Sequence, residues 1–180
     1  EDFPVMASSE YASNFSIDAA KLRRLFDNIT ISNAICFAPC GTIAYYTDTI
    51  VGKLMATDLD ADGWPTGKPR LIVDLSDEDY GIDGAVVDAD GNIWNAQWGD
   101  HSVVRYNPDG EIVEKLVIPA VQPSSVAIGG PNLDWLIVTT SRITLSPQQL
   151  ADYPLSGNVF IYQLHNVTGI VDTQCDLLTP

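Results

Sequence analysis

Residues 81–119 contain four short runs of strand-forming residues separated by three turn signals: GIDGAVVDADGNIWNAQWGDHSVVRYNPDGEIVEKLVIP. The turns ADG, WGD and NPDG supply the Gly, Pro, Asn and Asp that tight turns require. The runs at 85–88, 92–96, 102–106 and 112–118 have the length and the β-branched and aromatic content of strands. Four strands joined by tight turns predict one antiparallel sheet, which the acidic residue Asp83 opens.

The same plan occurs on either side of this segment. Before it, strand-like runs at 34–38, 42–47, 53–58 and 70–74 are separated by PCG, IVG and DADGWPTG. After it, runs at 125–128, 135–139 and 158–162 predict three strands, and residues 169–172 are the weakest candidate for a fourth. An insertion at 144–155 predicts one turn of helix at 146–152, because Pro147 suits the first helical position.

The spacing of these units predicts an all-β fold, a β-propeller of four-stranded antiparallel blades. Asn33 precedes Asp83 by about fifty residues, and Asp83 precedes Ser124 by about forty, which is the period of propeller blades. The innermost strand of each blade begins near the central channel. Asn33, Asp83 and either Ser124 or Ser125 are therefore expected to point toward one pocket.

Three blades cannot close a ring. The expected blades span about 31–74, 81–118 and 121–172, and they form a single domain or part of one within residues 21–180. Residues 21–26 could be the outer strand of another blade, with residues 1–20 as an N-terminal arm or partial blade. This leaves about three to four blades in the chain.

Charge and hydropathy argue against two kinds of partner. The chain has 24 acidic and 9 basic side chains, a net charge of −15, so a nucleic-acid phosphate backbone would be repelled. No apolar run is long enough to cross a bilayer, and the first residues lack the basic and apolar regions of a signal peptide. We therefore expect neither a nucleic-acid nor a membrane partner.

The cysteines and glycosylation sequons point to different compartments. An odd number of cysteines, at 36, 40 and 175, argues against a disulfide framework and favours a cytoplasmic protein. Cys36 and Cys40 are expected to be one core thiol and one turn thiol rather than metal ligands. Sequons at Asn14, Asn28 and Asn166 keep secretion open.

Five strings resemble a known family of proteins, which comprises senescence marker protein (regucalcin), gluconolactonase and luciferin-regenerating enzyme: ISNAICFAPCG, TDTIVGKL, DGAVVDADGNIWNAQWG, VVRYNPDG and GGPNLDWLIVTTS. They occur in the family's order with similar gaps, and the resemblance covers about residues 21–141. It implies a six-bladed propeller. It also implies hydrolysis of a sugar-type or related lactone with one divalent metal ion in the central channel.

The resemblance carries over two ligands of that metal. Asn33 in Ser32-Asn33-Ala34 matches the family's Asn ligand, and Asp83 in Ile82-Asp83-Gly84 matches its Asp ligand and catalytic base. Carboxylate and amide oxygens suit Ca²⁺, Mg²⁺, Mn²⁺ or Zn²⁺. Trp98 is expected at the channel mouth, where it could bind substrate.

The chain also departs from the family pattern. Family members are much longer, and no strand-leading motif before residue 21 supplies their first-blade Glu ligand. Glu1 and Glu10 are carboxylates in that region but match no motif. Ala34 replaces the usual Gly and Ile82 the usual Pro, so the backbone beside both ligands has different freedom.

Simpler structural roles compete with these assignments. Asn33 and Asp83 are also ordinary turn or strand-start residues, because short polar side chains bond nearby backbone. Asp48 is expected to fix a turn, Trp94 to lie in the core and His101 to be exposed in a hairpin.

Two functions therefore remain open. One is a metal-dependent lactonase. The alternative is a non-catalytic partial propeller, either a degenerate remnant or an interaction module whose open edges pair with a second copy or with a partner chain that completes the propeller.

Overall fold

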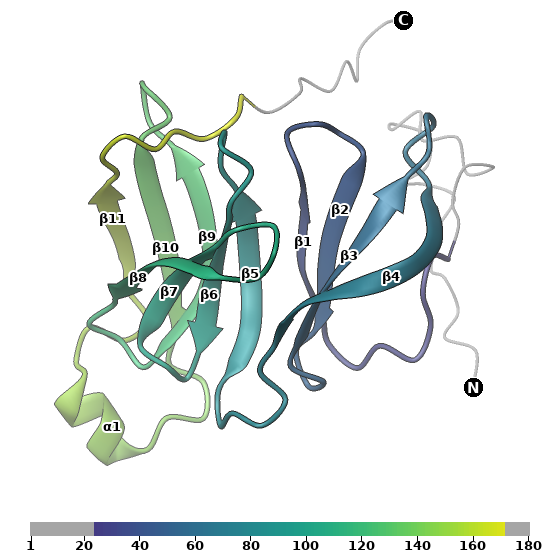
Figure 1. Ribbon diagram of the computed structural model, residues 1–180. Coiled ribbons are helices and arrows are strands. Elements are labelled where there is room, and N and C mark those ends of the chain that lie inside the picture. Colours follow the sequence, from purple (N-terminus) through teal and green to yellow (C-terminus); the bar gives the residue numbers. More distant parts are fainter. Residues whose placement is uncertain (1–23, 172–180) are drawn as a thin grey trace, which may run out of the picture. The chain divides into compact units, whose positions relative to one another are not determined.

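A computed structural model describes residues 24–171, and the chain divides into two compact units. One unit, residues 28–171, holds all of the described helices and strands (Figure 1). The strands are β1 (Ser32–Phe37), β2 (Ile43–Asp48), β3 (Lys53–Leu59), β4 (Pro65–Asp74), β5 (Gly81–Val87), β6 (Ile93–Trp98), β7 (Ser102–Tyr106), β8 (Ile112–Val117), β9 (Gln122–Gly129), β10 (Trp135–Ser141) and β11 (Val159–Gln163), and the helix is α1 (Pro147–Asp152).

The strands form three antiparallel sheets in chain order. The first sheet is β1-β2-β3-β4 and the second is β5-β6-β7-β8, while the third is β11-β10-β9. Neighbouring strands in each sheet pair antiparallel. The prediction of four-stranded antiparallel blades is thus confirmed for the first two sheets.

The third sheet lacks the fourth strand expected at 169–172. Residues 169–171 are described and contain no strand, while residue 172 lies outside the described range. Gly169 instead donates its amide to the Leu133 carbonyl at 2.7 Å. A Cβ atom added to Gly169 would lie 2.7 Å from Ile128 Cγ2, so this segment packs against the sheet rather than extending it.

Burial explains why the second sheet is so apolar. One hydrophobic cluster joins it to the first sheet through residues such as Leu54 and Ile93, and a second joins it to the third sheet through residues such as Trp94 and Leu136. Each of these side chains stabilises the fold by about 1.5–3 kcal/mol through burial. With both faces covered, every residue of β7 is buried. Trp94 lies in the core as expected.

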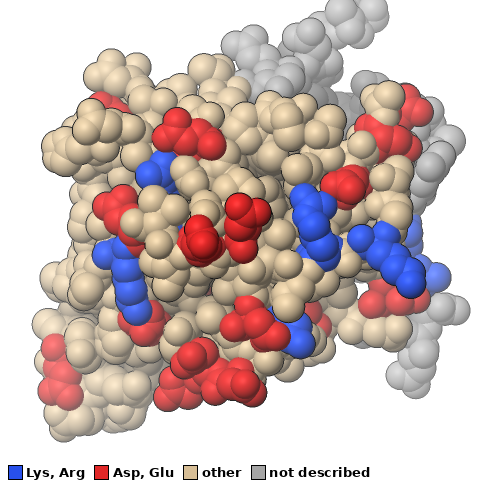
Figure 2. All heavy atoms as spheres, in the orientation of Figure 1, with Lys and Arg blue, Asp and Glu red and all other residues tan. Residues whose placement is uncertain are grey.

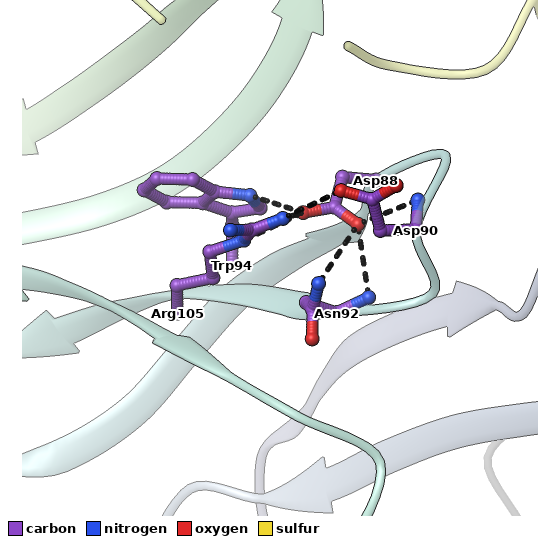
Figure 3. Close-up of polar contacts among 5 residues, drawn as sticks. All are labelled: Asp88, Asp90, Asn92, Trp94 and Arg105. Atoms are coloured by element: carbon purple, nitrogen blue, oxygen red, sulfur yellow. Dashed lines mark hydrogen bonds and ion pairs between the residues drawn. The ribbon is translucent and has the colours of Figure 1, made fainter. Parts of the chain in front are cut away.

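A buried polar network joins β6 and β7 to the end of β5 (Figure 3). Asp88 is fully buried, and its Oδ1 atom accepts the Asn92 amide at 2.9 Å, which closes the β5–β6 turn. Its Oδ2 atom accepts Trp94 Nε1 at 3.0 Å and Arg105 Nε at 2.8 Å. The Arg105 guanidinium also lies over the Trp94 ring. A buried carboxylate is tolerated here because it is both paired and hydrogen-bonded.

The insertion contains the predicted helix. Ser146 caps α1, accepting the Gln149 amide through its hydroxyl, while the Gln149 side chain accepts the Ser146 amide, which is a capping box. Pro147 lies at the start of the helix. After the helix, Tyr153 stacks against His101 with 4.4 Å between ring centroids, so His101 is half-buried rather than exposed.

Three further expectations from the sequence have structural outcomes. Residues 24–26 form no strand, so the outer strand expected at 21–26 is absent from its described part. Cys36 is buried and Cys40 exposed, as expected for a core thiol and a turn thiol. Asp48 accepts the backbone amides of Thr30, Ile31 and Ile50, which confirms that it fixes a turn. Cys175, Glu1 and Glu10 lie outside the described residues.

Candidate functional site

The innermost strands of the three sheets meet at their starts. β5 contacts β1 on one side and β9 on the other. Each of the three shows a shift in its pairing register near its first residues. Such bulges redirect side chains and are common beside active sites. The segment of chain that begins each sheet is therefore bent where the sheets approach one another.

Asn33 and Asp83 lie together at this point. The Asn33 Nδ2 group donates a hydrogen bond to Asp83 Oδ1, although the two residues are 50 positions apart in the chain. Thr49 reinforces the pair: its hydroxyl lies 3.4 Å from Asn33 Nδ2 and donates to the Ile82 carbonyl at 2.9 Å. The structure thus brings together the two residues that the sequence singled out.

The environment of Asp83 alters its acidity. The side chain is half-buried, and burial raises its pKa to about 6 because the carboxylate loses hydration. Hydrogen bonds from Asn33 and from the Gly84 amide oppose this rise, since they stabilise the ionised form. A carboxyl group that titrates near neutral pH is better matched to general-base work than an ordinary Asp.

The backbone beside Asn33 is strained. Ala34 has a φ of 52°, in the left-handed region, which costs a residue with a Cβ atom about 1–2 kcal/mol. Its side chain is buried in the cluster shared with the second sheet, so the surrounding packing holds it there. This strain lies at the β1 bulge, one residue from the Asn33–Asp83 contact.

Gly84 allows β9 to approach Asp83. A Cβ atom added to Gly84 would lie 2.5 Å from Ser125 Oγ and 2.8 Å from Ser125 Cα, so a larger residue would displace the β9 backbone. Ser124 lies beside this contact, and its hydroxyl is 2.9 Å from Thr139 Oγ1. Of the two serines expected at the site, Ser125 is the one that touches the residue next to Asp83.

Trp98 lies at the end of β6. It pairs with Gly81, two residues before Asp83, and is partly exposed. Its expected role in binding substrate stays a prediction.

One polar residue near the site was missed. Asn95 is fully buried on β6, and its side chain donates to the carbonyls of Asp83 and Gly84. The run NIWNAQW carried the only available signal, since it places Asn95 and Gln97 in a strand that is otherwise apolar.

The donors at this site partly fit a divalent ion. Asp83 offers carboxylate oxygens and Asn33 a carboxamide oxygen, which are ligands for hard cations. Among residues 24–171, no three His, Cys, Asp or Glu side chains lie close enough together to bind one metal ion. Among the described residues, this point therefore brings together two candidate ligands, Asp83 and Asn33.

The surface of the molecule is acidic. Figure 2 shows carboxylate side chains spread over the face in view, with fewer basic side chains among them. Such a surface attracts cations and repels anions. No helix in the described part of the chain is long and apolar enough to span a membrane.

Comparisons with known proteins identify similar sequences and structures. The chain is 44% identical over 147 residues to a Rhizobium meliloti protein named "Putative sugar lactone lactonase", covering 81% of this chain and 50% of that protein. It is 41% identical over 133 residues to an L-arabinolactonase of Azospirillum brasilense, covering 74% of this chain and 43% of that protein. The chain spans about half the length of the curated relatives it matches.

A solved structure supports the fold. The crystal structure of a calcium-binding protein, regucalcin, from Agrobacterium tumefaciens matches with a TM-score of 0.79 and 40% identity, over 83% of this chain and 51% of that one. The sheets are thus blades of a β-propeller. The model of the SMP-30/Gluconolactonase/LRE-like region matches residues 2–142, and the chain belongs to this family.

Proposed function

We propose that this chain contributes to the hydrolysis of a sugar-type or related lactone to its hydroxy acid, with Asp83 as general base and as a metal ligand. The observation that carries this proposal is the half-buried Asp83 carboxyl, with a pKa of about 6, held against Asn33 where β5 begins. Relatives named as lactonases support the reaction class. Because the chain spans about half of their length, further residues would complete the site.

Asp83 would act on water. In its ionised form it takes a proton as the water oxygen bonds to the lactone carbonyl carbon. The ring C–O bond then breaks, and the leaving alkoxide takes up the proton, so that one water is added overall. The new carboxylic acid ionises at neutral pH, and the acidic surface assists its release by repulsion.

Asn33 would assist as a second ligand. One divalent ion held by Asp83 and Asn33 would polarise the lactone carbonyl and increase the acidity of water. Oxygen ligands suit Ca²⁺, Mg²⁺ or Mn²⁺, and they can also bind Zn²⁺. A half-turn of the Asn33 carboxamide exchanges its NH₂ group for its oxygen, so the same side chain can serve Asp83 or an ion.

Acid release from sugar lactones tests the proposal. The 180-residue chain is assayed with a panel of such lactones and with Ca²⁺, Mg²⁺, Mn²⁺ or Zn²⁺, against the spontaneous rate. We expect Asp83→Asn to lower the metal-dependent rate by about 100-fold or more, since it removes the base and an ionised ligand. Asp109→Asn makes the same charge change on an exposed turn and should retain the rate. Metal-dependent activity that Asp83→Asn retains in full would overturn the proposal.

A second candidate is a non-catalytic interaction module, and exposed apolar side chains favour it. Ile35 and Phe37 on β1 are 64% and 56% exposed, and Val159 and Ile161 on β11 are 62% and 60% exposed. They lie on the outward faces of the first and third sheets, because alternate residues of both strands pack toward the second sheet. Such faces could pack against a second copy or a partner chain.

A further inference from the structure

We propose that Asn95 is a positioning residue for Asp83, and that Gln97 sets the orientation of Asn95. The claim deepens the proposed function and rests on it for the role of Asp83. It concerns how the fold orients the Asp83 carboxylate. Asn95 and Gln97 are both fully buried, so neither could act by contacting the substrate.

The bulge in β5 is where Asn95 acts. Ile82 pairs with Gln97 and Ala85 pairs with Asn95, so two residues of β5, Asp83 and Gly84, lie opposite Ala96 alone. Asn95 Nδ2 donates to the Asp83 carbonyl at 3.0 Å and to the Gly84 carbonyl at 3.2 Å. One side-chain amide thus holds both extra residues and fixes the backbone from which the Asp83 side chain projects.

Gln97 determines which way the Asn95 amide faces. Gln97 Nε2 donates to Asn95 Oδ1, so the Asn95 NH₂ group must point toward β5. Gln97 Nε2 also lies 3.5 Å from the Tyr106 hydroxyl, at the limit of a hydrogen bond. The chain of contacts therefore runs from β7 through Gln97 and Asn95 to the backbone of Asp83.

Two observations indicate that this arrangement does more than stabilise the fold. β1 has a bulge too, between Asn33 and Cys36. There Tyr45, which pairs with Cys36, occupies the position that Asn95 has opposite Ala85. A bulge at this level therefore stands without a side-chain amide. In addition, Gln97 Oε1 is buried with no hydrogen-bond partner among the described residues. Burying an unsatisfied oxygen is destabilising, so stability alone would favour an apolar residue at this position.

The experiment compares Asn95→Ala with a matched control, Trp94→Phe. Both variants remove a buried side-chain N–H donor from β6, but Trp94 serves Asp88 at the other end of β5. Two properties are measured on the full chain: the NMR resonances of the Asn33 side-chain NH₂ group, which report its bond to Asp83, and the dissociation constant for Mn²⁺ or Ca²⁺ by calorimetry.

We expect Asn95→Ala to shift the Asn33 NH₂ resonances toward those of a free carboxamide and to weaken metal binding about 10-fold or more. Trp94→Phe should leave the Asn33 NH₂ resonances unshifted and the dissociation constant within twofold of that of the unaltered protein. This should hold even where the two variants lose similar thermal stability. Gln97→Leu provides a second test should Asn95→Ala not fold, because it frees the Asn95 amide to turn and places an apolar side chain of similar size in the core. It should shift the same resonances.

Unchanged Asn33 resonances in Asn95→Ala and Gln97→Leu, or an equal shift in Trp94→Phe, would overturn the positioning role. Failure of the proposed function has a different signature: the unaltered protein would bind no divalent ion and open no lactone, while the resonance comparison would still decide the role of Asn95.

Discussion

Burial raises the pKa of Asp83 because the carboxylate loses part of its hydration where β1, β5 and β9 approach one another. An ordinary Asp titrates near 3.9, whereas Asp83 in the folded protein titrates at about 6. Between these values the folded state binds more protons than the unfolded state. The free energy of unfolding therefore falls as pH rises through this window.

Asp83→Asn should remove this contribution. Asn keeps an acceptor for the Asn33 NH₂ group but has no charge to desolvate, so the variant should be more stable than the unaltered chain above pH 6 and should lose this advantage toward pH 4. Urea unfolding at pH 4.5 and 7.5, with chelator present, measures the difference between the two proteins, in which the other carboxyl groups cancel. The same stability difference at both pH values would contradict the prediction.

Buried and exposed ion pairs of the second sheet should differ in their contribution to stability. The side chains of Arg105 and Asp88 are 10% and 0% exposed, and their closest atoms are 2.7 Å apart. Arg105→Met leaves an unpaired buried carboxylate, so we expect a loss of about 3–5 kcal/mol in urea unfolding. Lys115→Met removes the same charge from a 45% exposed partner of Asp100 and should cost about 1 kcal/mol or less. Equal losses would mean that Asp88 is well hydrated.

Short-range signals in the sequence predicted the elements well. The turn residues and β-branched runs predicted β5 to β8, and Pro147 predicted α1. Tertiary packing decided what the sequence could not. The run at 169–172 has strand-like residues, but Gly169 packs against Ile128 and leaves no paired strand in the described residues.

The site was predictable only in part for a similar reason. The resemblance to a family identified Asn33 and Asp83, and the structure brings them together. A bulge is a one-residue offset between two strands, and no property of a single strand reveals it. Asn95 was missed because a polar residue in a strand usually marks a solvent-facing position, whereas both faces of the second sheet are covered.

At the scale of the whole molecule, the three sheets differ in how they are covered. Strands β5 to β7 of the second sheet pack against a neighbour on each face, while its outer strand β8 and the first and third sheets present apolar side chains outward. These side chains include Phe37 and Ile161. Covering them would release water from apolar surface, so the outward faces favour association. The net charge of −15 opposes association between copies of the chain.

The balance of these two effects predicts association that salt strengthens. Light scattering of the full chain should give a mass above 19.5 kDa that rises with protein concentration, and further at higher ionic strength, because salt screens the repulsion. Phe37→Glu and Ile161→Glu should each lower the mass toward that of the monomer. Ile112→Glu places the same charge on a 63% exposed Ile of the second sheet and should have a smaller effect. A strictly monomeric chain at high concentration and high salt would exclude association through these faces, since repulsion would no longer explain it.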